Sequence, residues 1–303
     1  MTTFNLHPTF LRDVLGDSLT ITRARIDFFF DEQKRRKGFR PAGHISNSSH
    51  FECARSTQAP RLGVKIDPGS DIFNEDYAYA AAFGDAVHEV LQDILWDSGL
   101  TIRDGQWKPD DVEKKEVTFG RRNLSPLMAD LFETMDYSLR ADGALYMSGI
   151  ENSVWAEFKS KGGKYFSKHY EPYLNEALIH AEMQLQMALG FAEADYGFMV
   201  FVNRELNDKE RVTDEQIVLE DYRVYTVEAD RDYFTYRVAE ISKTAQKVRK
   251  GQLPMADNTR GSCKFCKVAI SCPVPTQYRK SSMPQYYAGI EEDAAMQRFM
   301  ARN

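Results

Sequence analysis

This sequence has few cysteines, no long apolar run and no excess of basic charge. Four cysteines in 303 residues are too few for the disulfide framework of a small secreted domain. The densest apolar cluster, residues 26–30, is short and interrupted, and no basic-then-apolar leader opens the chain. The net charge of −6 argues against a uniformly basic nucleic-acid coat. We therefore expect a soluble, cytoplasmic protein without a membrane segment.

The bulk composition is that of a folded protein. Hydrophobic residues make up 43% of the chain and aromatic residues 12%, enough to bury a substantial core in one large or two modest domains. A chain that is disordered throughout is excluded.

The placement of the cysteines indicates a metal site. Cys263, Cys266 and Cys272 form a C-x2-C-x5-C group, and Cys53 stands alone about two hundred positions earlier. Four thiolates can complete such a site and would tie the N- and C-terminal segments together. Zinc more often takes two close pairs of ligands, so an iron–sulfur cluster is favoured. A zinc-stabilised nucleic-acid-binding protein without catalysis is the alternative.

Periodicity predicts alternating helices and strands, and therefore an α/β fold. Residues 1–42 look helical, a short helix should carry Cys53, and residues 101–124 read as a loop. A hairpin is expected from residues 139–147 and 152–160. Further helices are expected at 80–98, 174–194 and 230–250, and further strands at 196–203 and 222–227.

The hairpin carries the candidate catalytic residues. Glu157 and Lys159 lie two apart in a strand and so share a face, while Phe158 turns into the core. Pairing of the hairpin would bring Asp142 to the same place. Two carboxylates with a nearby carbonyl suit Mg2+ or Mn2+, and a lysine beside them can orient a water. A charged pair on an exposed strand is the alternative.

Two helices add candidates to this site. His88, one turn after Gly84, is either a metal ligand or an ordinary helix histidine. Gln184 is the single polar member of a small apolar stripe, so its amide is either tied to backbone or reaches the site. Gln186 falls with Glu182, Gly190 and Glu193 on a more polar face, which predicts a surface position.

Two basic runs could bind nucleic acid. One spans residues 34–40, and the other spans 159–168 with aromatic residues interleaved and following as far as Tyr173. Cations beside stacking rings suit a single-strand groove, although a solvated face with core aromatics has the same pattern.

The order Cys53, His88, Asp142, Glu157, Lys159, Gln184 and the cysteine triplet resembles the PD-(D/E)XK nuclease superfamily over residues 45–275. The likeness is to its iron–sulfur branch, which includes CRISPR-associated exonucleases, the nuclease domain of AddB and many phage-encoded proteins. Ala188 and Ala54 depart from the aromatic and proline often found at these points.

The resemblance implies a restriction-endonuclease-like mixed sheet flanked by helices, with an iron–sulfur knot joining the terminal segments. His88, Asp142, Glu157 and the Phe158 carbonyl would hold Mn2+ or Mg2+, Lys159 would position water, and Gln184 would support the site. The four cysteines would bind a structural 4Fe-4S cluster. The organisation would be an N-terminal helical segment (1–44), the nuclease domain (45–275) and a peripheral tail (276–303).

The implied activity is metal-dependent exonuclease cleavage of DNA, single-stranded or at ends, in recombination or DNA degradation. Recombination or replication proteins are possible partners, and a phage-encoded protein would act in the host cytoplasm. A catalytically silent DNA-binding adaptor with the same fold is the second alternative.

Overall fold

A computed structural model describes residues 8–35, 45–47, 53–64, 75–98, 117–118, 125–145, 154–162, 171–204 and 215–254. The helices are α1 (Pro8–Leu15), α2 (Arg23–Arg35), α3 (Ala54–Gln58), α4 (Glu75–Asp97), α5 (Pro126–Thr134), α6 (Glu171–Phe191) and α7 (Arg231–Arg249), with one 3-10 turn, η1 (Ala59–Leu62).

The strands form one four-stranded sheet and three short pairs. The sheet has the order β10-β8-β7-β6, in which β7 and β8 are parallel and the other neighbours antiparallel. The pairs are β1 with β9, β2 with β4 and β3 with β5. The bounds are β1 (Leu19–Thr22), β2 (Ile45–Ser46), β3 (Val117–Thr118), β4 (Tyr137–Ser138), β5 (Arg140–Ala141), β6 (Gly143–Leu145), β7 (Val154–Lys161), β8 (Tyr196–Asn203), β9 (Gln216–Leu219) and β10 (Tyr222–Glu228).

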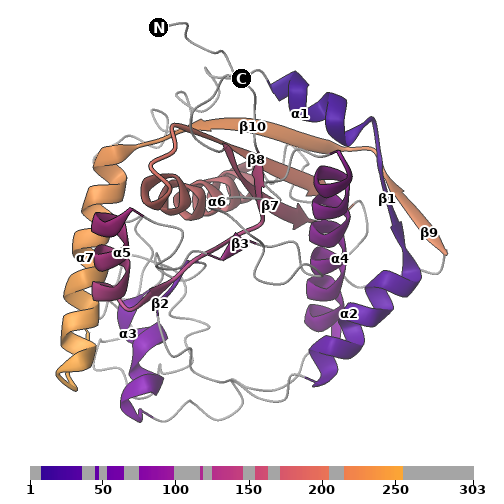
Figure 1. The fold of residues 1–303 in the computed structure, drawn as a ribbon. Helices are drawn as coiled ribbons and strands as arrows, with labels where there is room; N and C mark the ends of the chain where they lie inside the picture. Colours follow the sequence, from indigo (N-terminus) through magenta and orange to yellow (C-terminus); the bar gives the residue numbers. More distant parts are fainter. Residues whose placement is uncertain are drawn as a thin grey trace, which may run out of the picture.

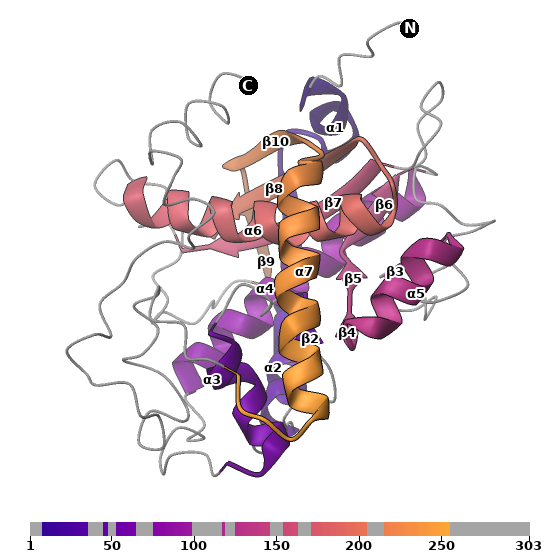
Figure 2. The ribbon, with the colours of Figure 1, turned by 90° about the vertical axis from the view of Figure 1, so that its left-hand side faces the viewer.

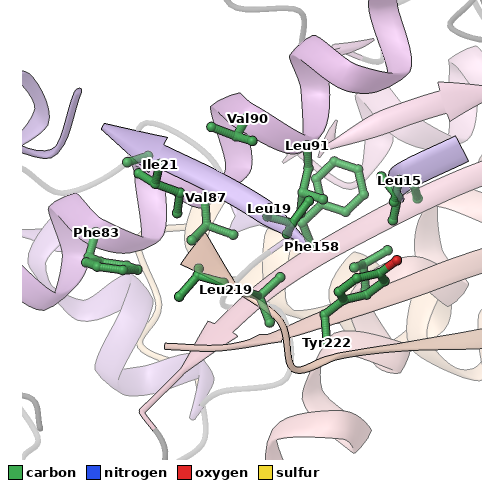
Figure 3. Close-up of a cluster of buried hydrophobic side chains, with 14 of the residues drawn as sticks. Leu15, Leu19, Ile21, Phe83, Val87, Val90, Leu91, Phe158, Leu219 and Tyr222 are labelled. Atoms are coloured by element: carbon green, nitrogen blue, oxygen red, sulfur yellow. The ribbon is translucent and has the colours of Figure 1, made fainter. Parts of the chain in front are cut away.

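Helices cover both sides of this mixed sheet, which confirms the α/β prediction. Figure 1 shows α4 and α2 together on one side and α5 and α7 on the opposite side, with α6 lying along the sheet. Alternation along β7 separates two cores, because Trp155 packs with α6 and α7 whereas Ala156 and Phe158 pack with α4 and α1. Figure 3 shows Phe158 in the second core, beside residues of β1, α4 and β10.

The N-terminal segment differs from the helix expected there. It is helical at 8–15 and 23–35, but β1 lies between the two helices and pairs in antiparallel register with β9. In β1 the buried residues Leu19 and Ile21 alternate with exposed threonines. A strand of four residues is too short for this two-residue period to be recognised in the sequence between two helices. The predicted loop at 101–124 lies outside the described residues, apart from β3 at 117–118.

Candidate active site

The hairpin brings the two predicted carboxylates together. The strand predicted at 139–147 is interrupted by a bend at Asp142, and because Gly143 of β6 pairs with Ala156 of β7, this bend comes next to Glu157. The amide of Phe158 donates to Asp142 Oδ2 at 2.7 Å. This contact fixes the carboxylate of Asp142 at the edge of β7, where the register of the hairpin predicts it.

Glu157 and Lys159 share the face of β7 that looks toward α6, as the two-residue period predicts. The Glu157 side chain is almost fully buried, at 7% exposure, and its Oε1 accepts from Lys159 Nζ. Lys159 retains more exposure, at 24% of its side chain. The pair therefore lies at the boundary between the core and solvent, with the ammonium on the outer side. Phe158 turns the other way, into the core, as predicted.

Burial, reinforced by the negative charge of Asp142, raises the pKa of Glu157 from 4.5 to about 8, against the opposing effect of Lys159. Burial by itself lowers the pKa of Lys159, but the charges of Glu157 and Asp142 outweigh it and raise that pKa. The lysine is therefore cationic at neutral pH. Ionisation of Glu157 would place two carboxylates beside one ammonium and leave this corner short of positive charge.

The raised pKa of Glu157 predicts how the stability of the metal-free protein depends on pH. Between about pH 4.5 and about pH 8 the folded state holds a proton at Glu157 that the unfolded state has released, so stability falls as pH rises. We expect Tm in EDTA to fall across this window by about 2–4 °C for each kcal/mol lost. Thermal unfolding at several pH values measures it.

The matched variants are Glu157→Gln, which removes the titrating group, and Glu240→Gln, which alters an exposed glutamate paired with Lys243. Glu157→Gln should flatten the pH dependence of Tm, and Glu240→Gln should leave it unchanged. Identical slopes in Glu157→Gln and the unmodified protein would contradict the buried, proton-holding carboxyl group.

Helix α4 supplies His88 to the same carboxylate. His88 Nδ1 lies 3.6 Å from Asp142 Oδ1. Gly84, one turn earlier, faces β7, and a Cβ there would lie 3.2 Å from Ser160 Oγ. His88 is thus beside Asp142, as a ligand would be, and its role as a ligand stays a prediction.

Gln184 is buried on α6, at 8% exposure, as its place in an apolar stripe predicted. Its backbone carbonyl accepts from Asn47 Nδ2 at 3.1 Å, and Asn47 Oδ1 accepts from the Tyr137 hydroxyl at 2.6 Å. Burial raises the pKa of that hydroxyl well above its ordinary value, so it remains a donor. These two hydrogen bonds could not be predicted from the sequence, because Asn47 and Tyr137 are 90 positions apart.

Gln186 was predicted on the surface, and that prediction is wrong. The residue is 2% exposed, Nε2 donates to Glu228 O at 2.8 Å, and Oε1 accepts from Asp230 N at 2.7 Å. Its amide joins α6 to the start of α7, which crosses α6 in Figure 2. The polar face of α6 is therefore an interface, with a buried amide satisfied by backbone.

Of the four cysteines predicted to bind the cluster, Cys53 alone lies in the part of the chain that the structure describes. Cys53 is buried just before α3, and its carbonyl accepts from Thr57 N at 3.1 Å. Cys263, Cys266 and Cys272 lie outside the described residues. Within the described ranges, no three His, Cys, Asp or Glu side chains are close enough to hold a metal ion. Both ligand sets stay predictions.

The donor chemistry at Asp142 and Glu157 nevertheless fits a hard divalent cation. The two carboxylates interact electrostatically, because ionisation of Glu157 is opposed by burial and by the charge of Asp142. A cation would offset both costs, and carboxylate and carbonyl oxygens are the ligands that Mg2+ and Mn2+ prefer.

In the basic runs, Lys34 and Arg35 lie near Asp31 and Glu32 of their own helix, which agrees with a solvated face there.

Comparisons with known proteins give only remote likenesses. No family model matches the chain, and no curated protein matches it. The solved structure of SSO0001 is 18% identical, covers 82% of this chain and 95% of its own, and has a TM-score of 0.41. LHK-Exo in complex with dAMP is 9% identical, covers 74% of this chain and 93% of its own, and has a TM-score of 0.36. Likeness at this level decides neither fold nor function.

No helix among the described residues is long and apolar enough to cross a membrane.

Proposed function

We propose that this chain is a metal-dependent nuclease that hydrolyses phosphodiester bonds in DNA. The observation that carries the proposal is that Asp142, Glu157 and Lys159 come together at one end of a hairpin, where Lys159 bonds to Glu157 and the charge of Asp142 acts on both. Buried carboxylates that share a site are costly to the fold, and such costs are typical of catalytic positions. The lysine on the same face distinguishes the group from a plain cation-binding pair.

Each residue of the site has a separate role in the proposed reaction. Asp142, Glu157, His88 and the Phe158 carbonyl hold Mn2+ or Mg2+, which when bound supplies Lewis acidity toward the phosphate oxygens. Lys159, which remains protonated, donates to the attacking water and orients it. The Phe158 amide keeps the Asp142 carboxylate in place during this step. Gln184 lies on the facing helix and supports the site or the DNA.

We also propose that Cys53, with Cys263, Cys266 and Cys272, binds a 4Fe-4S cluster. The described part of the chain supports a structural role at Cys53. The segment around it is tied to the strand that leads to Asp142 by β2–β4 pairing and by the 2.6 Å contact of Arg61 Nη2 with Asp136 Oδ2. A cluster there would hold the terminal segments onto the core that carries the carboxylates.

The finer assignment is an exonuclease that acts on single-stranded DNA or on ends, in recombination or DNA degradation. Recombination or replication proteins would then be its partners. A silent DNA-binding adaptor and a zinc-stabilised binding protein are the alternatives.

The test is cleavage of end-labelled single- and double-stranded DNA by anaerobically purified protein, with Mn2+, Mg2+ or EDTA. We expect cleavage with either cation and none in EDTA, with a product ladder that gives the polarity. A visible spectrum of the same sample reports the cluster. Absence of cleavage by folded, cluster-loaded protein with both cations would reject the nuclease and favour the adaptor.

A further inference from the structure

Gln92 makes a buried contact with the main chain of Asp142. It lies on α4 one turn after His88 and is 6% exposed. Its Nε2 donates to the carbonyl oxygen of Asp142 at 2.9 Å. A buried amide without a hydrogen-bond partner is costly, so the fold has to provide the Gln92 amide with an acceptor.

Asp142 lies where the strand changes partner. β5, just before it, pairs with β3, and β6, just after it, pairs with β7. Asp142 itself is a bend between the two strands, and the last β7 residue that pairs with β6 is Ala156. A residue at such a junction is not fixed by either ladder, so its orientation depends on other contacts.

Helix α4 supplies those contacts. Gln92 holds the backbone of Asp142, and His88 lies beside its carboxylate. Gly143, the next residue, packs against the same helix, where a Cβ would be in van der Waals contact with Leu95 at 3.4 Å. The carboxylate held in this way is the one that accepts from the Phe158 amide, next to Glu157.

We propose that Gln92 is a positioning residue for Asp142. By holding the carbonyl of the bend it sets the direction of the Asp142 carboxylate, and so the geometry of the pair that Asp142 makes with Glu157. The effect of losing Gln92 on metal binding and cleavage rests on the proposed function. The effect of losing Gln92 on the Asp142–Phe158 hydrogen bond does not depend on that function.

The test compares Gln92→Met, which keeps the length of the side chain and loses the donor, with the unmodified protein. The first measurement is hydrogen exchange at the Phe158 amide in EDTA, which reports whether the Asp142 carboxylate is held. The second is Mn2+ affinity by calorimetry, with kcat and KM for DNA. We expect reduced protection of Phe158, Mn2+ affinity lower by about 10–100-fold, and a lower kcat at limiting Mn2+ with KM for DNA unchanged.

Two further variants sharpen the test. Gln33→Met removes a hydrogen bond of the same length that another glutamine makes to α4, from Gln33 Nε2 of α2 to Asp85 Oδ2, and should behave as the unmodified protein. Gln92→Glu can donate only when its carboxyl group is protonated, so the protection factor of Phe158 should be lost at alkaline pH and restored at acidic pH. This variant also serves if Gln92→Met does not fold.

The outcomes separate the two proposals. Loss of Phe158 protection in Gln92→Met, in a protein that never cleaves DNA, would support the positioning role and reject the nuclease. A cleaving protein in which Gln92→Met and Gln92→Glu keep normal protection and Mn2+ affinity would overturn the role of Gln92 and leave the nuclease standing.

Discussion

Glu157→Gln is expected to lower metal-dependent cleavage of DNA by about a thousandfold or more, since a lost ligand removes several kcal/mol of transition-state stabilisation. Glutamine has nearly the same volume and can accept from Lys159 in place of the carboxylate, so the fold should persist. The substitution also removes an ionisable group that burial opposes. Measurement of kcat/KM in Mn2+, beside circular dichroism and Tm, separates loss of chemistry from loss of structure.

Glu240→Gln is the matched control for this loss. It makes the same chemical change at an exposed glutamate of α7, whose partner Lys243 lies 2.6 Å away. It should retain full activity, because exposed ion pairs contribute little. If Glu157→Gln purified in parallel cleaved as fast as the unmodified protein, Glu157 would not be a ligand, and the activity would belong to another site or to a contaminant.

The candidate site was the most predictable part of the molecule, because its geometry follows from local rules. A two-residue period places Glu157 and Lys159 on one face wherever that strand lies, and hairpin pairing then brings Asp142 beside them. β8 matches its predicted range and β10 extends one residue beyond it, since both are long runs of β-branched and aromatic residues.

What the sequence could not predict are contacts between distant segments. β1, β2 and β9 are two to four residues long, and each exists because a remote partner pairs with it. Gln92 shares a face of α4 with His88, so a spacing of four residues could have marked it, but the bend that needs its amide appears only in three dimensions. Contacts between distant segments produce no periodic pattern in the sequence from which they could be predicted.

The face of α6 that was predicted to be polar shows the same limit. Gln186 and Gly190 fall together on it, and the sequence suggests solvent because an amide and a glycine add little hydrophobicity. In the structure this face meets α7. The amide bonds to backbone at Glu228 and Asp230, and the missing side chain of Gly190 makes room for Phe234.

Gly190→Ala is therefore expected to destabilise the protein, although the same change in a helix interior ordinarily stabilises by about 1 kcal/mol. A Cβ at position 190 would lie 2.0 Å from Cδ2 of Phe234, far inside contact distance. Phe234 cannot easily give way, because it is buried and its ring packs edge-on against Phe191 with centroids 5.1 Å apart. Overpacking of this kind costs about 3 kcal/mol, which corresponds to a fall in Tm of about 6–12 °C.

Gly84→Ala provides the matched comparison, because Gly84 is also inside a helix and its added Cβ would meet only the Ser160 hydroxyl, at 3.2 Å. A hydroxyl can rotate away, so this variant should stay within about 1 kcal/mol of the unmodified protein. Phe234→Leu should relieve Gly190→Ala, giving a double variant more stable than the sum of the two single losses predicts. A Gly190→Ala protein as stable as the unmodified one would mean that α7 does not pack against α6 at this point, and the buried setting of Gln186 would fall with it.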